Sequence, residues 1–480
     1  MFNIPYIPIL IPQNNYKKEF LNLLKYLKPE WLEDSIIFEY FNKGTTNTII
    51  SASLQPLSHS AIPTNCNLTP ASNPNNNGSQ SHNHITNLEN QHTQRYSENI
   101  SQNSVVNQDI LLIRIYGHKT EVIIDREKEI ENMVAMWSIG CGSELYCTFM
   151  NGLCYGYAKG HAISIKTITD PIIYPIIAGK LVRMHFAFPN QPSKPTVKLV
   201  PVDIGNYEKS QAILAGNDEK KECVDNSLCF LIVDKFQNNI KKIDKTGEKL
   251  LDYPIACYFP TIRKWASLIL PLLDEKNIVN RFDYKNNSGK SYVSSIKDCG
   301  NKRSLLLSQL PVDPWEEIDY LEKVLLPMNS PIVFCHNDLL LDNIIYDYHK
   351  GNMSFIDFEY ADFNYQAFDI AHFFCEFAGL ETVDYSLFPN SAFRRKWLAL
   401  YLNEWQKIHH KIDANYTLFP NLDELMNQVD KFILAPHLFW GVWAILQSQV
   451  SDKSFDYFAY AKIRLSEYSR LKSDPSILNL

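Results

Sequence analysis

The sequence lacks the patterns that mark several large classes of protein. Its ten cysteines include no C-x-x-C pair, which argues against a disulfide framework or a cysteine-ligated zinc site and favours a reducing, cytoplasmic compartment. The 46 lysine and arginine residues form no long basic run, and the net charge is −7. We therefore expect no nucleic-acid partner.

No apolar run reaches the roughly 20 residues that a membrane-spanning helix needs. The longest, FILAPHLFWGVWAIL at 432–446, contains Pro436 and His437 and is typical of a buried helix. The opening MFNIPYIPILIP lacks a basic leader and a small-residue cleavage site, and three prolines interrupt it, so it does not read as a signal peptide. We expect a globular protein without a membrane span.

Two familiar phosphate-binding patterns are incomplete. GKS at 289–291 resembles the end of a P-loop, but Tyr284 stands where that loop needs a glycine. GCGSEL at 140–145 begins like a dinucleotide fingerprint, but Leu145 takes the place of its last glycine. Neither pattern predicts a nucleotide site.

Periodic patterns indicate strands and a helix in the first third of the chain. Residues 36–54 and 109–116 are rich in β-branched and aromatic side chains, and 145–157 reads as a strand pair. Residues 125–139 have the spacing of an amphipathic helix. Its predicted buried face comprises Ile130, Met133, Val134 and Trp137. Helical patterns dominate from about residue 171 onward.

This order of elements predicts an α+β protein of two lobes. With 480 residues, 45% of them hydrophobic, the chain can form a small, mixed, β-rich lobe over 16–158 and a larger, mainly helical lobe over 159–480. Asn, Ser and Gln dominate 58–108, which we predict to be a disordered insertion in a hairpin. Polar stretches make 188–258 and 281–305 partly insertions.

Acidic residues and an asparagine stand among strand-like residues in FCHNDLLLDNIIYDYHKGNMSFIDFEY, 334–360. Because buried charges are costly without a partner, their presence needs a cause. PIVFC at 331–335 reads as a strand that enters a polar loop, and NIIYD and MSFIDF read as a hairpin. The hairpin brings Asp357 back toward Asp338 and Asn343.

This convergence predicts a phosphotransfer site. Mg²⁺ prefers oxygen ligands and shares them with substrate phosphates, and Asn343 and Asp357 offer such oxygens. Asp338 then remains to accept or orient the proton of a hydroxyl group. The alternative interpretation is a pair of strand ends with solvated carboxylates.

Two tryptophans, Trp440 and Trp443, lie three residues apart and so on one side of a helix. Tryptophan faces attract ammonium groups. Taken alone, such a pair more often fills a core.

These segments together resemble the choline and ethanolamine kinase family, which shares its fold with protein kinases and aminoglycoside phosphotransferases. The resemblance rests on HNDLLLDNIIYD, FIDFEYADFNYQAFDIAHFFCEFAG, NKGTTN, LLIRIYG, LYCTFMNGLCY, HLFWGVWAI and YFAYAKIR. It implies a two-lobed, protein-kinase-like fold that uses Mg²⁺ and ATP. Because relatives are often dimers, it also implies a homodimer.

The resemblance implies a role for each matching residue. The catalytic base falls on Asp338 and the metal ligands fall on Asn343 and Asp357. The turn that covers the phosphates comprises Gly44, Thr46 and Asn47. Arg114 matches the phosphate-holding lysine of protein kinases, and an arginine can bind phosphate oxygens in bidentate fashion. Its helix partner matches Glu129, with Glu127 and Glu131 as alternatives, and a surface charge on an edge strand is the other interpretation of Arg114.

For the second substrate, the resemblance adds Tyr360, Glu376 and Tyr460 to the two tryptophans as an ammonium-binding wall. Choline kinases usually have glutamine two residues after the catalytic aspartate and ethanolamine kinases have leucine, and this chain has Leu340. EFAG at 376–379 and KTEVIIDRE at 119–127 also look like the ethanolamine branch. The implied reaction is the phosphorylation of ethanolamine to phosphoethanolamine, first step of the CDP-ethanolamine route to phosphatidylethanolamine. Choline kinase and a dual-specificity kinase stay as alternatives.

The chain departs from the family pattern in two places. Where relatives commonly read DIGNHF, it reads DIAHFF, with Ala371, His372 and Phe373 at the changed positions. Gly156 stands in LCYGY where relatives often have an acid. We expect the first to alter the wall near Glu376, the second to alter contacts with adenine, and neither to touch the phosphotransfer residues.

Two other functions compete with the kinase hypothesis. A non-catalytic, kinase-like scaffold would account for the altered DIAHFF segment and the Asn-rich insertion. A metallohydrolase built on His336 and Asp338 would need further histidines in a ligand pattern, and the sequence has none.

Overall fold

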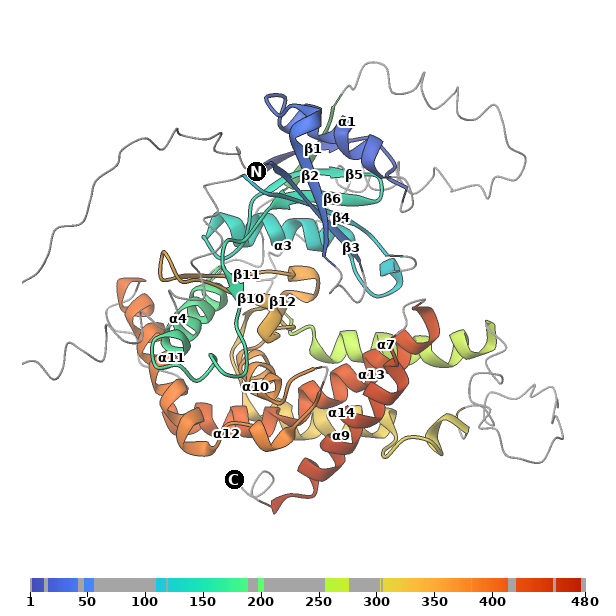
Figure 1. Ribbon diagram of the computed structural model, residues 1–480. Helices are drawn as coiled ribbons and strands as arrows, with labels where there is room; N and C mark the ends of the chain where they lie inside the picture. Colours follow the sequence, from blue (N-terminus) through green and yellow to red (C-terminus); the bar gives the residue numbers. More distant parts are fainter. Residues whose placement is uncertain are drawn as a thin grey trace, which may run out of the picture.

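The structure is a computed structural model (Figure 1). It describes residues 2–12, 16–41, 47–55, 109–117, 120–188, 197–202, 255–275, 303, 305–380, 382–412, 420–451 and 455–475.

A seven-stranded sheet forms the first lobe, at the top of Figure 1. Its strands are β1 (Phe2–Ile7), β2 (Ile36–Phe41), β3 (Thr48–Leu54), β4 (Leu111–Ile115), β5 (Leu145–Phe149), β6 (Gly152–Gly156) and β8 (Val197–Pro201). They lie in the order β2-β3-β4-β6-β5-β1-β8. The strands from β2 to β5 are antiparallel, whereas β1 runs parallel to β5 and β8.

The predicted strand patterns are confirmed. Residues 36–54 hold β2 and β3, and 145–157 hold the pair β5 and β6. β3 pairs with β4, so the segment between them does join two neighbouring antiparallel strands. The segment predicted to be disordered, 58–108, lies outside the described residues, as does the GKS segment at 289–291.

Two strands of the sheet were not predicted. β1 precedes the expected lobe boundary at 16, and β8 falls in a region taken as partly insertion. Pro5 in β1 has no N–H to donate, and proline ordinarily argues against an inner strand. The pairing of β1 with β5 is short, limited to Tyr6 and Ile7.

Helices cover both faces of the sheet. α1 (Lys17–Leu27) packs Phe20, Leu23 and Leu24 against one face, above the sheet in Figure 1. α3 (Arg126–Ser138) lies below, and the Asp125 side chain caps it by accepting from Lys128 N.

The predicted buried face of α3 is wrong at one residue. Ile130, Met133 and Val134 are buried, whereas Trp137 is 39% exposed. The Trp137 ring meets Phe2 edge-on with ring centres 6.2 Å apart, so the unpredicted β1 supplies its neighbour.

The second lobe is mainly helical, which agrees with the predicted fold class. Its helices are α4 (Ile173–His185), α7 (Tyr258–Glu275), α9 (Pro314–Leu325), α10 (Gln366–Cys375), α11 (Ser391–Ile412), α12 (Leu422–Phe432), α13 (Leu434–Val450) and α14 (Tyr457–Lys472). Short strands lie at its top: β7 (His161–Ala162), β9 (Ile332–Cys335), β10 (Ile344–Asp347), β11 (Asn352–Phe355) and β12 (Asp362–Tyr365). The 3₁₀ turns are η1 (Glu33–Ser35), η2 (Thr120–Val122), η4 (Leu326–Met328), η5 (Leu341–Asn343), η6 (Phe358–Tyr360), η7 (Glu376–Ala378) and η8 (Tyr385–Leu387).

α13 is the buried helix that the apolar run predicts. The span Leu422–Val450 is long and apolar enough to cross a membrane, but 94% of its most apolar window is buried inside the protein, as in the core helix of a folded lobe. Gly441 lets α14 approach, because a Cβ there would lie 2.7 Å from the Leu465 side chain.

Candidate active site

A loop and a hairpin at the top of the helical lobe bring the predicted site together. β9 leads into the loop that holds Asp338, and β10 and β11 form the predicted hairpin, with Ile344 opposite Phe355. Ile356 N then donates to Asn343 O at 3.0 Å. Asp338, Asn343 and Asp357 consequently line one cleft of about 450 Å³.

Asp357 has a left-handed backbone, with φ of 65°. Non-glycine residues adopt this conformation rarely, and it clusters at functional sites. Its Oδ1 accepts from Arg114 Nη2 at 3.1 Å, and the side chain is 31% exposed. One carboxylate oxygen is thus held by the arginine while the group still faces the cleft.

The donor atoms fit a hard cation such as Mg²⁺. Asn343 Nδ2 donates to the backbone oxygen of Asp338 at 2.9 Å, so the amide nitrogen is engaged and its oxygen is the atom left to ligate. With the Asp357 carboxylate, this gives the oxygen donors that Mg²⁺ prefers.

The Asp338 carboxyl lies in a strongly perturbing environment. Burial raises its pKa well above the usual range, and the nearby carboxylates of Asp357, Glu376 and Glu359 raise it further, while Arg464 opposes them. Among the described residues, no hydrogen bond reaches this carboxylate. A perturbed acid in a cleft is a recognised mark of a functional site.

The predicted register of Arg114 is confirmed. Arg114 Nη1 donates to Glu129 Oε1 at 2.6 Å, so Glu129 is the helix partner that contacts it. The alternative of an edge-strand surface charge is wrong, because Arg114 is 5% exposed and β4 lies between β3 and β6. Its contact with Asp357 joins the sheet lobe to the hairpin.

Arg126 and Glu359 extend this pair into a network. Arg126 Nη1 lies 2.8 Å from Glu129 Oε2 and 3.4 Å from Glu359 Oε2, and its guanidinium stacks on Tyr116 at 4.0 Å. Burial raises the pKa of Glu359 to about 8, and the carboxylates of Asp357 and Glu129 add to this effect. Sequence analysis did not assign Arg126, although it opens the same helix as Glu129.

Three of these carboxylates, Glu129, Asp357 and Glu359, have oxygen atoms within 4.8 Å of one another. Such a group could hold a metal ion, but Arg114 and Arg126 already contact it. Two guanidinium charges make this cluster an ion-pair network rather than a second metal site.

Of the predicted phosphate-covering turn, Gly44 and Thr46 lie outside the described residues. Asn47 directly precedes β3, is 5% exposed and donates to Glu359 Oε2 at 3.3 Å. Its Oδ1 accepts from Gly117 N and from Arg126. Asn47 therefore anchors the end of the turn to the network.

The predicted aromatic wall lines the same cleft. The rings of Trp440 and Trp443 lie 5.3 Å apart at 80°, and Tyr360 meets Trp440 at 5.2 Å. Trp443 Nε1 donates to the Tyr360 hydroxyl at 2.9 Å. Tyr460 lines this end as well, with Phe455 and Tyr457, which sequence analysis did not single out.

Glu376 supplies a carboxylate to the aromatic end of the cleft. It is 3% exposed, and Arg464 Nη1 donates to its Oε1 at 3.2 Å. Burial raises the pKa of Glu376 although Arg464 opposes this. The acid therefore stands beside both an aromatic wall and a buried arginine.

The DIAHFF departure lies closer to the phosphotransfer residues than predicted. His372 Nε2 is 3.9 Å from Asp338 Oδ1 and 3.7 Å from Glu376 Oε1. The expectation that this segment alters only the wall near Glu376 is therefore wrong, because one turn of α10 faces both acids. Gly156, the other departure, lines the cleft at the end of β6, and its N donates to Glu144 O at 2.8 Å.

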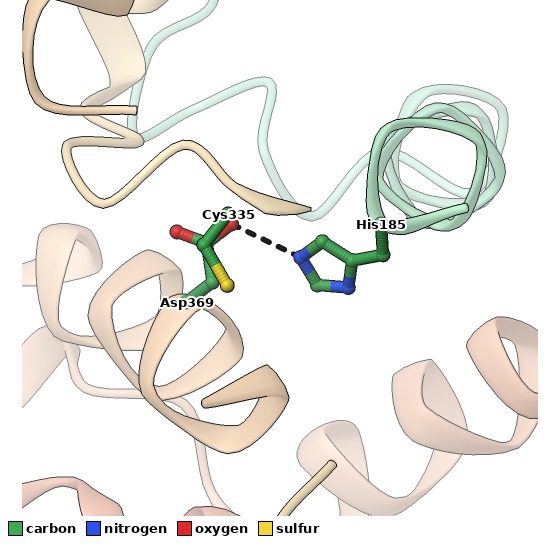
Figure 2. Close-up of side chains that lie close together, drawn as sticks. All are labelled: His185, Cys335 and Asp369. Atoms are coloured by element: carbon green, nitrogen blue, oxygen red, sulfur yellow. Dashed lines mark hydrogen bonds and ion pairs between the residues drawn. The ribbon is translucent and has the colours of Figure 1, made fainter. Parts of the chain in front are cut away.

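A buried cluster behind the loop fixes its backbone. Asp369 accepts from the backbone N of His336 and of Asn337, each at 2.8 Å, and lies 3.0 Å from His185 Nε2. Figure 2 shows His185 and Asp369 pointing toward one another, with Cys335 beside them. His185 Nδ1 also meets the Tyr401 hydroxyl at 2.6 Å, so both ring nitrogens are engaged, and Asp369, His185 and Tyr401 form a hydrogen-bonded support.

His336 does not face the cleft. Its Nε2 donates to Ile356 O at 3.0 Å, and burial lowers its pKa. The metallohydrolase hypothesis needs an imidazole nitrogen of His336 beside Asp338 in the cleft, and His336 is not among the residues that line it.

The β-rich lobe, the helical lobe, and a cleft with an arginine–glutamate pair facing a carboxylate loop define a phosphotransferase of the protein-kinase-like fold. Residues 83–469 match the sequence model described as choline/ethanolamine kinase. The chain belongs to this family.

Individual relatives agree with this assignment. Ethanolamine kinase 1 of Mus musculus is 31% identical over 375 residues, which cover 78% of this chain and 80% of that protein. Ethanolamine kinase 2 of the same species is 33% identical over 373 residues, covering 78% and 72%. The solved structure of Plasmodium vivax ethanolamine kinase shares the fold, with a TM-score of 0.54 at 20% identity over 97% of each chain.

Proposed function

We propose that this protein transfers the γ-phosphoryl group of ATP to the hydroxyl group of ethanolamine. The product is phosphoethanolamine, in the first step of the CDP-ethanolamine route to phosphatidylethanolamine. The observation that carries the proposal is the shared cleft, which Asp338, Asn343 and Asp357 line together with Arg114 and the aromatic wall.

Arg114, Asn343 and Asp357 serve the nucleotide in this proposal. Asn343 and Asp357 hold Mg²⁺, which neutralises charge on the phosphates as they transfer. Arg114 binds phosphate oxygens and keeps Asp357 in place. The family resemblance assigns Gly44, Thr46 and Asn47 to the segment that covers the phosphates, and Glu129 holds Arg114 in register.

Asp338 and the aromatic end serve the acceptor. Asp338 accepts or orients the hydroxyl proton, because its carboxylate is otherwise without a hydrogen bond among the described residues. The Glu376 carboxylate can stabilise a positively charged amine, and it lines the cleft together with Tyr360, Trp440, Trp443 and Tyr460. Cation–π attraction and one carboxylate together suit a small ammonium group.

Ethanolamine is the preferred acceptor in this proposal. The relatives described above are named as ethanolamine kinases, and Leu340 lines the cleft. A primary ammonium has three N–H donors that need acceptors, whereas a trimethylammonium has none. The aromatic wall supports choline as a second candidate, because trimethylammonium groups bind ring faces.

We also propose a cellular location and an oligomeric state for the protein. The described cysteines, Cys141, Cys147, Cys154, Cys257, Cys335 and Cys375, are free thiols, which supports a cytoplasmic location. Self-association as a homodimer stays a prediction from the family resemblance, and light scattering of the purified chain tests it.

The deciding experiment is an assay of the full chain with MgATP. ADP release is followed with ethanolamine, with choline and with neither, and ³¹P NMR identifies the product. The proposal expects phosphoethanolamine at a higher kcat/KM than phosphocholine, and no turnover in EDTA. Equal or higher efficiency with choline would favour the choline or dual-specificity alternative. Absence of turnover with both acceptors would favour the scaffold.

A further inference from the structure

The imidazole of His372 stands between two acids of the cleft that come from different elements. Its Nε2 lies 3.9 Å from Asp338 Oδ1, on the loop after β9, and 3.7 Å from Glu376 Oε1, one turn further along. No other side chain is recorded within ion-pair range of both acids among the described residues.

His372 is placed to act on these acids rather than on a substrate. It is fully buried and does not line the cleft. Its ring lies 5.8 Å from that of Trp440 and 6.2 Å from that of Phe368, so packing fixes its position. Asp338 and Glu376 do line the cleft, so the imidazole can influence a ligand through them.

The ring is neutral and incompletely paired. Burial lowers the pKa of His372 to about 3, and Arg464 lowers it further, so one ring nitrogen carries a hydrogen and the other is an acceptor. Neither nitrogen has a hydrogen-bond partner within the described part of the chain. Buried polar atoms in native proteins are nearly always paired, and each one left unpaired calls for an explanation.

A small closure would supply the bond that Nε2 lacks. The distances of 3.7 and 3.9 Å exceed the upper limit of an N–H···O hydrogen bond by about 0.5 to 0.7 Å. Hydrogen bonds at catalytic sites are often long without substrate and tighten in the complex. Nε2 lies at nearly equal distances from the two carboxylates, so one N–H there is within reach of both after a small movement.

We propose that His372 is a positioning residue that sets the separation between Asp338 and Glu376 and thereby selects the length of the amino alcohol. The inference rests on the proposed function, in which Asp338 meets the hydroxyl group and Glu376 meets the ammonium group. Two carbons separate these groups in ethanolamine. By donating toward both acids, the imidazole holds them at the spacing that this length requires, while Arg464 holds Glu376 from its other side.

The test compares ethanolamine with 3-amino-1-propanol, which is one carbon longer. Three variants of the full chain separate the ring from its donor. His372→Phe keeps the ring and removes both nitrogens. His372→Gln keeps an N–H near the position of Nε2, and His372→Asn places its N–H near that of Nδ1. Initial rates at saturating MgATP give kcat and KM for each alcohol, and thermal melting checks the fold.

We expect His372→Phe to lower kcat/KM for ethanolamine about tenfold and to affect the longer alcohol less, because misplacement of a reacting group is costly. The ratio between the two alcohols therefore falls, while KM for ATP stays unchanged. His372→Gln should keep the wild-type ratio. A role in packing alone would lower both alcohols in parallel and leave the ratio unchanged.

Three results would overturn the inference: an unchanged ratio in His372→Phe, a ratio in His372→Gln as low as in His372→Phe, or a changed KM for ATP alone. If His372→Phe does not fold, His372→Gln and His372→Asn decide, because equal ratios in these two contradict a donor at Nε2. Wild-type protein that phosphorylates neither alcohol removes the proposed function and the inference together, whereas active wild type with an unchanged ratio removes the inference alone.

Discussion

The two ends of the cleft differ in how their charged groups are paired. At the nucleotide end, Arg114 and Arg126 contact Glu129, Asp357 and Glu359 at 2.6 to 3.9 Å. At the acceptor end, Glu376 is paired with Arg464, but no hydrogen bond reaches the Asp338 carboxylate among the described residues. The carboxylates of the nucleotide end are held by arginines before any ligand arrives, whereas Asp338, which lines the cleft, is left for a substrate to complete.

This difference has a physical basis. The phosphates of ATP carry the same charges in every turnover. An ion-pair network that forms before ATP binds can therefore hold Arg114 in one fixed position. An amino alcohol must be distinguished from similar molecules, and unpaired polar groups penalise any molecule that fails to satisfy them. Four predictions test the contrast.

The largest expected effect is at Asp338. Asp338→Ala should lower kcat about a thousandfold and leave the melting temperature near that of the wild type, because the lost carboxylate makes no hydrogen bond within the described chain. Steady-state kinetics with ethanolamine and a thermal melt measure both quantities. Asp347→Asn is the matched control, since it lies at the end of β10, on the hairpin that follows the Asp338 loop, and keeps the oxygen that accepts from His349 N. A fully active Asp338→Ala protein would refute the assignment of the acceptor end.

At the nucleotide end the expected effect is on stability. Glu129 is fully buried, and Glu129→Gln removes the carboxylate that lies nearest to both Arg114 and Arg126, leaving only the longer contacts of the two arginines with Glu359. Breaking a buried ion pair from one side costs about 3 kcal/mol, so urea unfolding should show a loss of that size. Exposed Glu121→Gln serves as the control. A loss no larger than that of the control would mean that the network is not the prepaired support described here.

Acid should act on the acceptor end through His372. The pKa of this histidine is lowered to about 3 in the folded protein, so the unfolded chain binds a proton first as the pH falls below about 6.5. Stability from this group is complete at neutral pH and declines on acidification, by about 2 kcal/mol at pH 5. His372→Phe should therefore lose less stability between pH 7 and pH 5 than the wild type.

Unfolding in urea at both pH values measures this difference. His349→Gln, at an exposed position, is the control and should keep the wild-type dependence. The same acid loss in His372→Phe as in the wild type would contradict a neutral, buried imidazole.

The smallest expected effect is on binding of the ammonium group. Trp440→Leu removes one aromatic face, which is worth up to about 2 kcal/mol, and should raise KM for ethanolamine about tenfold while leaving KM for ATP unchanged. Trp137→Leu, on the outer side of α3, is the control. An equal rise of both KM values would contradict the assignment of Trp440 to the acceptor end alone.

Local sequence signals predicted much of this arrangement. The hairpin of β10 and β11 follows from two short strand patterns around a Lys-Gly turn, and it carries Asp357 to the loop of Asp338. Arg114 and Glu129 were assigned from the family resemblance, which left Glu127 and Glu131 as alternative partners, and the contact in the structure selects Glu129. Signals of this kind lie within short windows of the chain.

Long-range contacts escaped prediction. β1 and β8 are far apart in sequence, and Pro5 weakens the strand pattern of β1. His372 meets Asp338 across 34 positions, and no periodic pattern reports such a contact. Trp137 was placed on the wrong side of α3 because its neighbour Phe2 belongs to that unpredicted strand.

The pairing of β8 with β1 bears on how the lobes can move. After β6 the chain passes to α4 in the helical lobe, returns to the sheet as β8, and passes down again to α7. The chain therefore crosses between the two lobes three times, rather than once through a single hinge. Any opening of the cleft must also keep the parallel ladder from Phe2–Val197 to Tyr6–Pro201, so the first strand of the chain moves together with the strand that follows α4.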